Sequence, residues 1–192
     1  MGALLLLGAL LLSGCGGSSS HTVTAPRRPV RQNDFATIAV ASPARMGNGV
    51  IASRYTCTGG NVSPPITWAG VNANAKEVAI LVRALLGRGR FAVNWAVAGI
   101  APTANSLSAG ALPTGAVVGR NSSGQDRYSL CDTGSKLVPL FTIAVLALPH
   151  KLNLSRGFDP AILTQQLGKP GVQWGSMVAY WRNPNAPIPS GG

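Results

Sequence analysis

The stretch RYTCTGGNVSPPITW, residues 54–68, decides the fold of this chain. Its Gly59-Gly60 and Pro64-Pro65 pairs predict a loop, because glycine and proline interrupt regular secondary structure. Residues 66–68, Ile-Thr-Trp, are β-branched and aromatic, so we expect a short strand directly after the loop. A structured loop that feeds a strand favours a β domain.

The segments outward from this stretch are also mainly strand-like. Residues 137–148 form the longest apolar run of the domain, and a buried helix is an alternative there, but Val, Ile, Thr and Phe favour a core strand. The other predicted strands are rich in β-branched and aromatic residues and cover residues 37–41, 77–82, 91–97 and 173–181.

One helix is predicted, over residues 159–167. Asp159 can cap it, Pro160 suits the first helical position, and Gly168 suits its end. Residues 101–119 are predicted to be loop. The fold class is therefore mainly β with few helices.

The composition bounds the class of protein. The 192 residues are 46% hydrophobic with a mean hydropathy of +0.23, which excludes a disordered chain and leaves roughly one domain after the N-terminal segments. The net charge is +11, but the basic residues are scattered and no run carries interleaved aromatics, so we expect no nucleic-acid binding. Attraction to an anionic membrane or wall explains the charge, and solubility alone explains it equally well.

The N-terminus resembles a bacterial lipoprotein leader. An Ala/Leu/Gly run over residues 3–12, too short to span a bilayer, leads into Leu12-Ser13-Gly14-Cys15, which is similar to the lipobox. No Lys or Arg precedes the run, which departs from that pattern. We expect cleavage before Cys15 and lipid on its thiol, with an uncleaved or soluble N-terminus as the alternative. The predicted parts are a signal peptide (1–14), a flexible tether (15–34), the domain (35–182) and a loose tail (183–192).

Residues 54–68 also closely match the Tyr-Thr-Cys-Asp-Gly…Ser-Pro-Pro-Leu-x-Trp pattern of the phosphatidylethanolamine-binding protein (PEBP, Raf kinase inhibitor-like) family, in its bacterial branch. Supporting matches are Asn94 to Ile100, then Gly119, Asn121 and Tyr128, and finally Leu146-Ala147-Leu148, so the resemblance covers about residues 44–182. It implies a large antiparallel sheet, a smaller sheet, helices near the C-terminus, and a small pocket for phosphate-like groups.

The residues that the family places in this pocket are mostly replaced. Ala84 and Leu86 fall where the family has a loop with two aspartates, Asn94 falls at the first histidine, and Pro139 aligns with the second. Tyr128 stands as the family has it. Because Asn and Pro cannot carry the charge of a histidine, the resemblance implies a degenerate anion pocket.

Three arginines reverse the sign of the local charge. Arg83, Arg88 and Arg90 could grip an anion, and a solvated basic loop is the blander alternative. His21 and His150 lie outside the family's site positions. With five acidic residues and two histidines in the whole chain, we expect no enzyme, no metal site and no cofactor.

Cys57 and Cys131 are expected to form a disulfide. If Cys15 carries lipid, an even number of cysteines remains in an oxidising compartment. The family fold places both of their loops near the pocket mouth. Two buried free thiols are the alternative.

These observations lead to two hypotheses about function. The first is a lipid-anchored binding or scaffold protein on the extracytoplasmic face of the cell membrane, which acts through protein contacts. The alternative is a carrier or sensor of a small amphiphile or anionic lipid head group.

Overall fold

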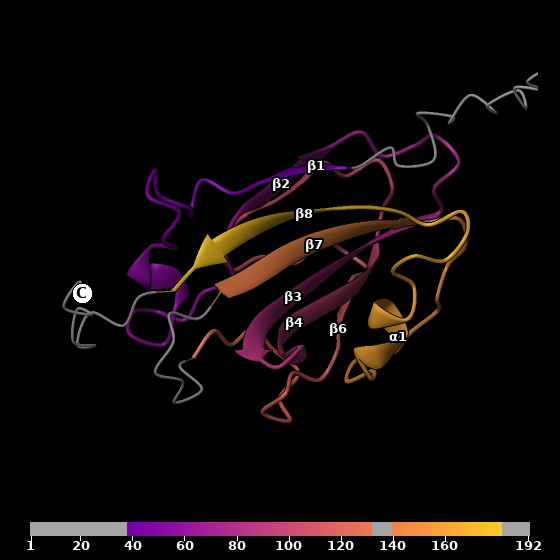
Figure 1. Ribbon diagram of the computed structural model, residues 1–192. Coiled ribbons are helices and arrows are strands. Elements are labelled where there is room, and N and C mark those ends of the chain that lie inside the picture. The colour runs from indigo at the N-terminus through magenta and orange to yellow at the C-terminus, as the bar shows by residue number, and fades with distance from the viewer. Residues whose placement is uncertain (1–37, 132–139, 182–192) are drawn as a thin grey trace, which may run out of the picture. The chain divides into compact units, whose positions relative to one another are not determined.

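The computed structural model describes residues 38–131 and 140–181. Its larger sheet has five antiparallel strands in the order β6-β4-β3-β7-β8 (Figure 1). The strands are β3 (Glu77–Gly87), β4 (Arg90–Ile100), β6 (Val117–Val118), β7 (Leu140–Leu148) and β8 (Gln173–Tyr180). The two eleven-residue strands, β3 and β4, form its centre together with β7.

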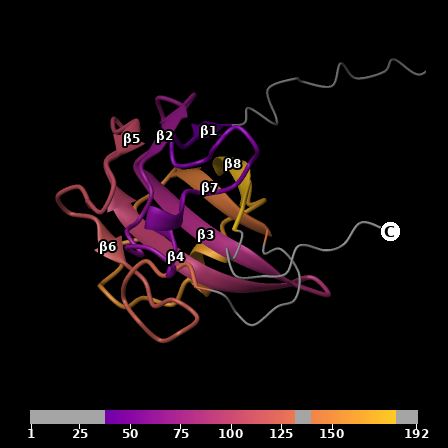
Figure 2. The same ribbon diagram turned by 90° about the vertical axis from the view of Figure 1, so that its left-hand side faces the viewer.

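The smaller sheet has three antiparallel strands in the order β1-β2-β5, seen above the larger sheet in Figure 2. These are β1 (Ala39–Ala41), β2 (Ile66–Ala69) and β5 (Ser106–Leu107). A 3-10 turn, η2 (Ser53–Tyr55), opens the loop that leads into β2. The prediction of a mainly β fold with two sheets is confirmed.

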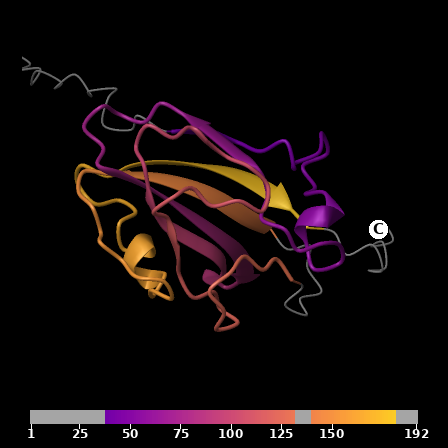
Figure 3. The same ribbon diagram turned by 180° about the vertical axis from the view of Figure 1, so that it is seen from behind.

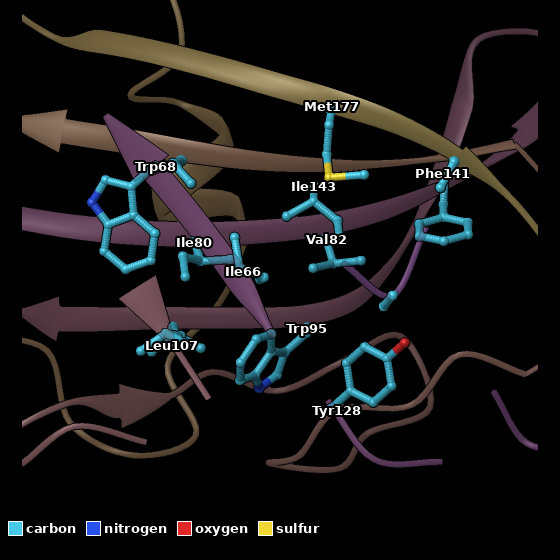
Figure 4. Packing of buried hydrophobic residues seen from close by; sticks show 14 of the residues in the cluster. Ile66, Trp68, Ile80, Val82, Trp95, Leu107, Tyr128, Phe141, Ile143 and Met177 are labelled. Atoms are coloured by element: carbon cyan, nitrogen blue, oxygen red, sulfur yellow. The ribbon is translucent and has the colours of Figure 1, made fainter. Parts of the chain in front are cut away.

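The main core lies between the two sheets. Ile66, Trp68 and Leu107 of the small sheet pack against residues of the large one, which include Ile80, Val82, Trp95, Phe141, Ile143 and Met177 (Figure 4). The run at 137–148 is therefore a core strand from Leu140 onward, and not a helix. Its first three residues lie outside the described residues.

A second cluster covers the outer face of the large sheet. Here the sheet contributes four alanines, Ala79, Ala96, Ala98 and Ala144, beside three leucines of β3 and β7, and Phe158 and Leu163 belong to the same cluster. Leu163 belongs to helix α1 (Ala161–Thr164), which Figure 3 shows beside the sheet. No helix of the described residues is long and apolar enough to cross a membrane.

The helix is shorter than the nine residues predicted. Asp159 does contribute, because its Oδ1 accepts a hydrogen bond of 2.9 Å from the backbone N–H of Ala161. After Thr164 the chain continues in single turns, and Gly168 then takes a positive φ of 81° that ends the segment. Residues 101–119 are mostly loop as predicted, although β5 and β6 interrupt them.

Candidate functional site

Tyr128 lies where the family resemblance placed it, but its hydroxyl is already used within the fold. The phenol donates a 2.7 Å hydrogen bond to the backbone carbonyl of Tyr55. Its ring meets Trp95 edge-on, with 5.7 Å between centroids. Burial raises the pKa of Tyr128 far above the ordinary range of a phenol. The side chain is therefore a neutral, buried cross-link between two loops.

Asn94 lies at an irregularity of β4. Trp95 pairs with Val82 and Val93 pairs with Arg83, so Asn94 is the extra residue of a β-bulge. Its side-chain Nδ2 donates to the backbone carbonyl of Ser129 at 2.9 Å. The backbone carbonyl of Asn94 accepts from the N–H of Ser129 at 3.0 Å. Its Oδ1 is buried without a partner. The amide that replaces the family histidine thus holds the segment that carries Tyr128.

The neighbouring loop is joined to the same segment. A disulfide links Cys57 to Cys131, with 4.9 Å between their Cα atoms. The N–H of Leu130 donates to Oδ1 of Asn61 at 3.0 Å, and its carbonyl accepts from the N–H of Cys57 at 3.0 Å. The polar groups around Tyr128 therefore hold the two loop segments together by hydrogen bonds within the protein.

The prediction of a pocket loop at Ala84 and Leu86 is wrong. Both residues belong to β3, and Ala84 faces the main core. Gly87 pairs with Arg90, so only Arg88 and Gly89 form the turn, with φ of 51° and 72°. Two positive φ values suit the tight primed turns of hairpins. The chain thus has a long β3–β4 hairpin here (Figure 2). Ala84 and Leu86 are strand residues of this hairpin and belong to no loop. Pro139 lies outside the described residues.

The three candidate arginines are not brought together. Arg88 sits in the turn and Arg90 begins β4, both exposed at the hairpin end. Arg83 lies earlier in β3, where its strand-pairing partners are Val93 on β4 and Thr142 on β7. Its guanidinium carbon stands 4.7 Å from the centroid of the Phe91 ring. Only Arg83 among the three lines a hollow.

That hollow is a cleft of about 680 Å³ between the outer face of the large sheet and the α1 region. Arg83, Phe91 and Val93 line it on the sheet side, and Ala161 and Thr164 line it on the other. Phe91, Val93 and the α1 residues are not among the site residues predicted from the sequence. The alternation of Arg83 with Leu85 on β3 was a signal that both side chains share one face.

The histidines and the predicted lipidation cysteine add no further site to the described residues. His150 is exposed after β7, and His21 and Cys15 lie outside the described residues. Within residues 38–131 and 140–181 no group of three or more His, Cys, Asp or Glu could hold a metal ion.

The fold is defined by two antiparallel sheets, the core between them and the loop at residues 54–68. Known proteins share this combination. The family model described as phosphatidylethanolamine-binding protein matches residues 41–179. The chain belongs to the phosphatidylethanolamine-binding protein family.

Its relatives include the "Putative lipoprotein LppC" of Mycobacterium tuberculosis (strain H37Rv), which is 34% identical over 156 residues and covers 76% of this chain and 77% of the relative. Escherichia coli YbcL, whose crystal structure describes a member of the PEBP family, aligns with a TM-score of 0.63 and 26% identity over 75% of this chain and 98% of that one. The PEBP homologue CT736 of Chlamydia trachomatis has the same fold, with a TM-score of 0.66 at 21% identity over 77% and 99% of the two chains.

Proposed function

We propose that this protein is a lipid-anchored binding protein of the cell envelope that no longer uses the family pocket for phosphate head groups, and that it acts through contacts with another protein. The observation that carries the proposal is the engagement of Asn94 and Tyr128. Both side chains hydrogen bond to the chain's own backbone, at 2.9 and 2.7 Å. An anion would meet no charged donor from either residue, and Tyr128 could donate to it only by breaking its bond to Tyr55.

The lipid anchor in this proposal is supported by two observations. Leu12-Ser13-Gly14-Cys15 resembles a lipobox, and a 34% identical relative carries the name of a lipoprotein. Cys15→Ala should release the protein from the membrane or leave a longer precursor. A variant that fractionates and migrates like the wild type would contradict the anchor.

An apolar stripe on β8 supports a protein contact. Trp174, Val178 and Tyr180 alternate along the strand and point to the same face, each about two-fifths exposed. β8 is the last strand of its sheet. Adjacent exposed large apolar side chains are typical of protein contact surfaces.

Binding is also proposed in place of catalysis, because the carboxylates of the described residues serve the fold. Glu77 accepts hydrogen bonds from the backbone N–H groups of Gly99 and Leu152, at 3.0 and 2.9 Å. The carboxylate of Asp126 forms ion pairs with two arginines, with its Oδ1 3.9 Å from Nε of Arg120 and its Oδ2 3.6 Å from Nε of Arg156. Both acids are therefore engaged, Glu77 by backbone N–H groups and Asp126 by arginines, which leaves neither as an uncommitted general acid or base.

Site-specific photo-crosslinking in the native host tests the protein contact. A photoreactive amino acid at Val178 should give a discrete protein adduct, and one at the exposed Ser108, directly after β5, should not. Trp174→Ser should reduce the Val178 adduct. Adducts with lipid alone at Val178, or the same protein adduct from both positions, would contradict the proposal.

A second candidate function, a carrier or sensor of a small amphiphile, is favoured by a different observation. The cleft beside Arg83 combines apolar side chains with one half-buried cation.

A further inference from the structure

The outer face of the large sheet is covered at one end and open at the other. At the covered end, Leu163 and Phe158 pack on alanines of the sheet. Toward the β3–β4 hairpin, Leu85 pairs with Phe91, and both side chains are exposed. The cleft of about 680 Å³ lies where the covered and open parts meet.

Arg83 lines the sheet side of this cleft and has no ionic partner within residues 38–131 and 140–181. The ion pairs of the described residues join Arg120 and Arg156 to Asp126 and do not include Arg83. The part of the chain that the structure describes gives its buried Nε no hydrogen-bond partner, and it gives none to Oγ1 of Thr142, the direct neighbour on β7. A buried N–H of a cation that lacks an acceptor is costly, so a ligand that supplies one gains that energy.

The surroundings of Arg83 indicate what kind of acceptor fits. Burial lowers the pKa of Arg83 from its ordinary value, but a guanidinium keeps its charge at neutral pH. Phe91 covers the guanidinium from one side at 4.7 Å. Arg120, which also lines the cleft, is already shared with Asp126, and Asp159 contributes a negative charge. A cation with no ion pair among the described residues, beside apolar side chains, favours a ligand with an anionic head and an apolar body.

We propose that this cleft binds a single-chain amphiphile with one oxyanion head, a carboxylate or a phosphate, in which Arg83 binds the head and Phe91, Val93 and Ala161 contact the chain. The site lies on the face of the sheet opposite to Trp95 and Tyr128, which belong to the core between the sheets. It is therefore distinct from the family's pocket. The proposal deepens the second candidate function and rests on it, but it requires neither the protein contact nor the loss of the family pocket.

Photoaffinity labelling of the full chain in its membrane tests the proposal. The probes are dodecanoate and dodecyl phosphate that carry a diazirine on the chain, with the corresponding dodecanol as the headless control. Both anions should label the segments that contain Phe91–Val93 or Pro160–Thr164, read by peptide mass spectrometry. Because a charge-assisted hydrogen bond is lost, Arg83→Gln should reduce the labelling about tenfold.

Matched variants make the result decisive. Arg88→Gln removes the same charge from the exposed hairpin turn and should leave the labelling unchanged. Ala161→Trp keeps Arg83 but fills the cleft from an exposed position of α1, and it should also abolish the labelling. Thermal unfolding of each variant verifies that the fold is kept.

Three outcomes would overturn the inference. These are labelling by dodecanol as strong as that by the anions, labelling that Arg83→Gln leaves intact, and displacement of the label by millimolar inorganic phosphate, which would show that the head alone is bound. Strong labelling by only one of the two anions would identify the head group and support the inference. Crosslinking at Val178 reads a protein adduct, whereas this experiment reads an amphiphile on the peptides that contain Phe91–Val93 or Pro160–Thr164, so failure here and failure of the protein contact are separate results.

Discussion

The Tyr128 hydroxyl donates a 2.7 Å hydrogen bond to the backbone carbonyl of Tyr55, 73 positions earlier in the chain. This bond joins the loop at residues 54–68 to the segment that carries Tyr128. Tyr128→Phe should lower the free energy of unfolding by about 1 kcal/mol, because the buried carbonyl loses its donor. Urea unfolding measures this change. Tyr180→Phe, on an exposed ring, is the control, and equal effects of the two variants would contradict a structural role for the bond.

The same residue predicts a pH dependence. The pKa of Tyr128 is raised by burial, so the folded protein keeps its proton at a pH at which the unfolded chain releases it. This contribution to stability is complete below a pH of about 10, the ordinary phenol pKa, and falls as the pH rises above it. Urea unfolding at alkaline pH should show a steeper loss for the wild type than for Tyr128→Phe. Parallel pH profiles would show that Tyr128 ionises as readily in the folded protein as in the unfolded chain.

Glu77 predicts a second structural effect. It is 3% exposed, and its two carboxylate oxygens accept separate backbone N–H groups, of Gly99 and Leu152. Gln can accept with only one of the two atoms, so Glu77→Gln should destabilise the fold by about 1–3 kcal/mol. Lys76→Gln, on the exposed neighbour, should change the free energy of unfolding by less than about 0.5 kcal/mol. A neutral effect of Glu77→Gln in thermal or urea unfolding would refute this account.

The hairpin turn contains a residue that can be improved. Arg88 has a φ of 51°, a left-handed conformation that costs most side chains energy, and Gly89 follows it. Because Asn-Gly is the preferred pair in such turns, Arg88→Asn should raise the free energy of unfolding by about 0.5–1 kcal/mol. Arg90→Asn changes the same charge outside the turn and should bring no gain. If both variants shift stability equally, the charge and not the turn is responsible.

The disulfide between Cys57 and Cys131 closes a loop across a separation of 74 positions. In the chain-entropy treatment it stabilises the fold by about 4 kcal/mol. Thiol titration of the denatured, unreduced protein should find neither cysteine reactive, and Cys57→Ser with Cys131→Ser should lower the midpoint of urea unfolding. Two reactive thiols would rule the bridge out.

Much of the fold could be predicted from sequence, because β-branched runs and the Gly- and Pro-rich loop at residues 54–68 both report local structure directly. The Ala84–Leu86 segment shows where the prediction was wrong. The family's loop was assumed there, although Gly87-Arg88-Gly89 already carried the chemistry of a tight turn. The local turn residues determined the structure, and β3 runs on to Gly87.

The cleft beside Arg83 could not be predicted in the same way. It depends on where the short α1 lies on the sheet, and four helical residues carry little periodicity. The bulge at Asn94 was also hidden, because a one-residue shift in strand pairing leaves no compositional mark. Both features arise from tertiary pairing between segments far apart in the chain.

The central claim is that the family pocket no longer takes a phosphate head group, and calorimetric titration of the protein with phosphoethanolamine tests it most directly. Tyr128 could donate to a phosphate only by giving up its bond to Tyr55, and Asn94 has one further N–H, worth roughly 1 kcal/mol, which does not offset the desolvation of a phosphate. The account predicts affinity no better than millimolar, unchanged by Asn94→Ala. Micromolar binding that Asn94→Ala abolishes would contradict it.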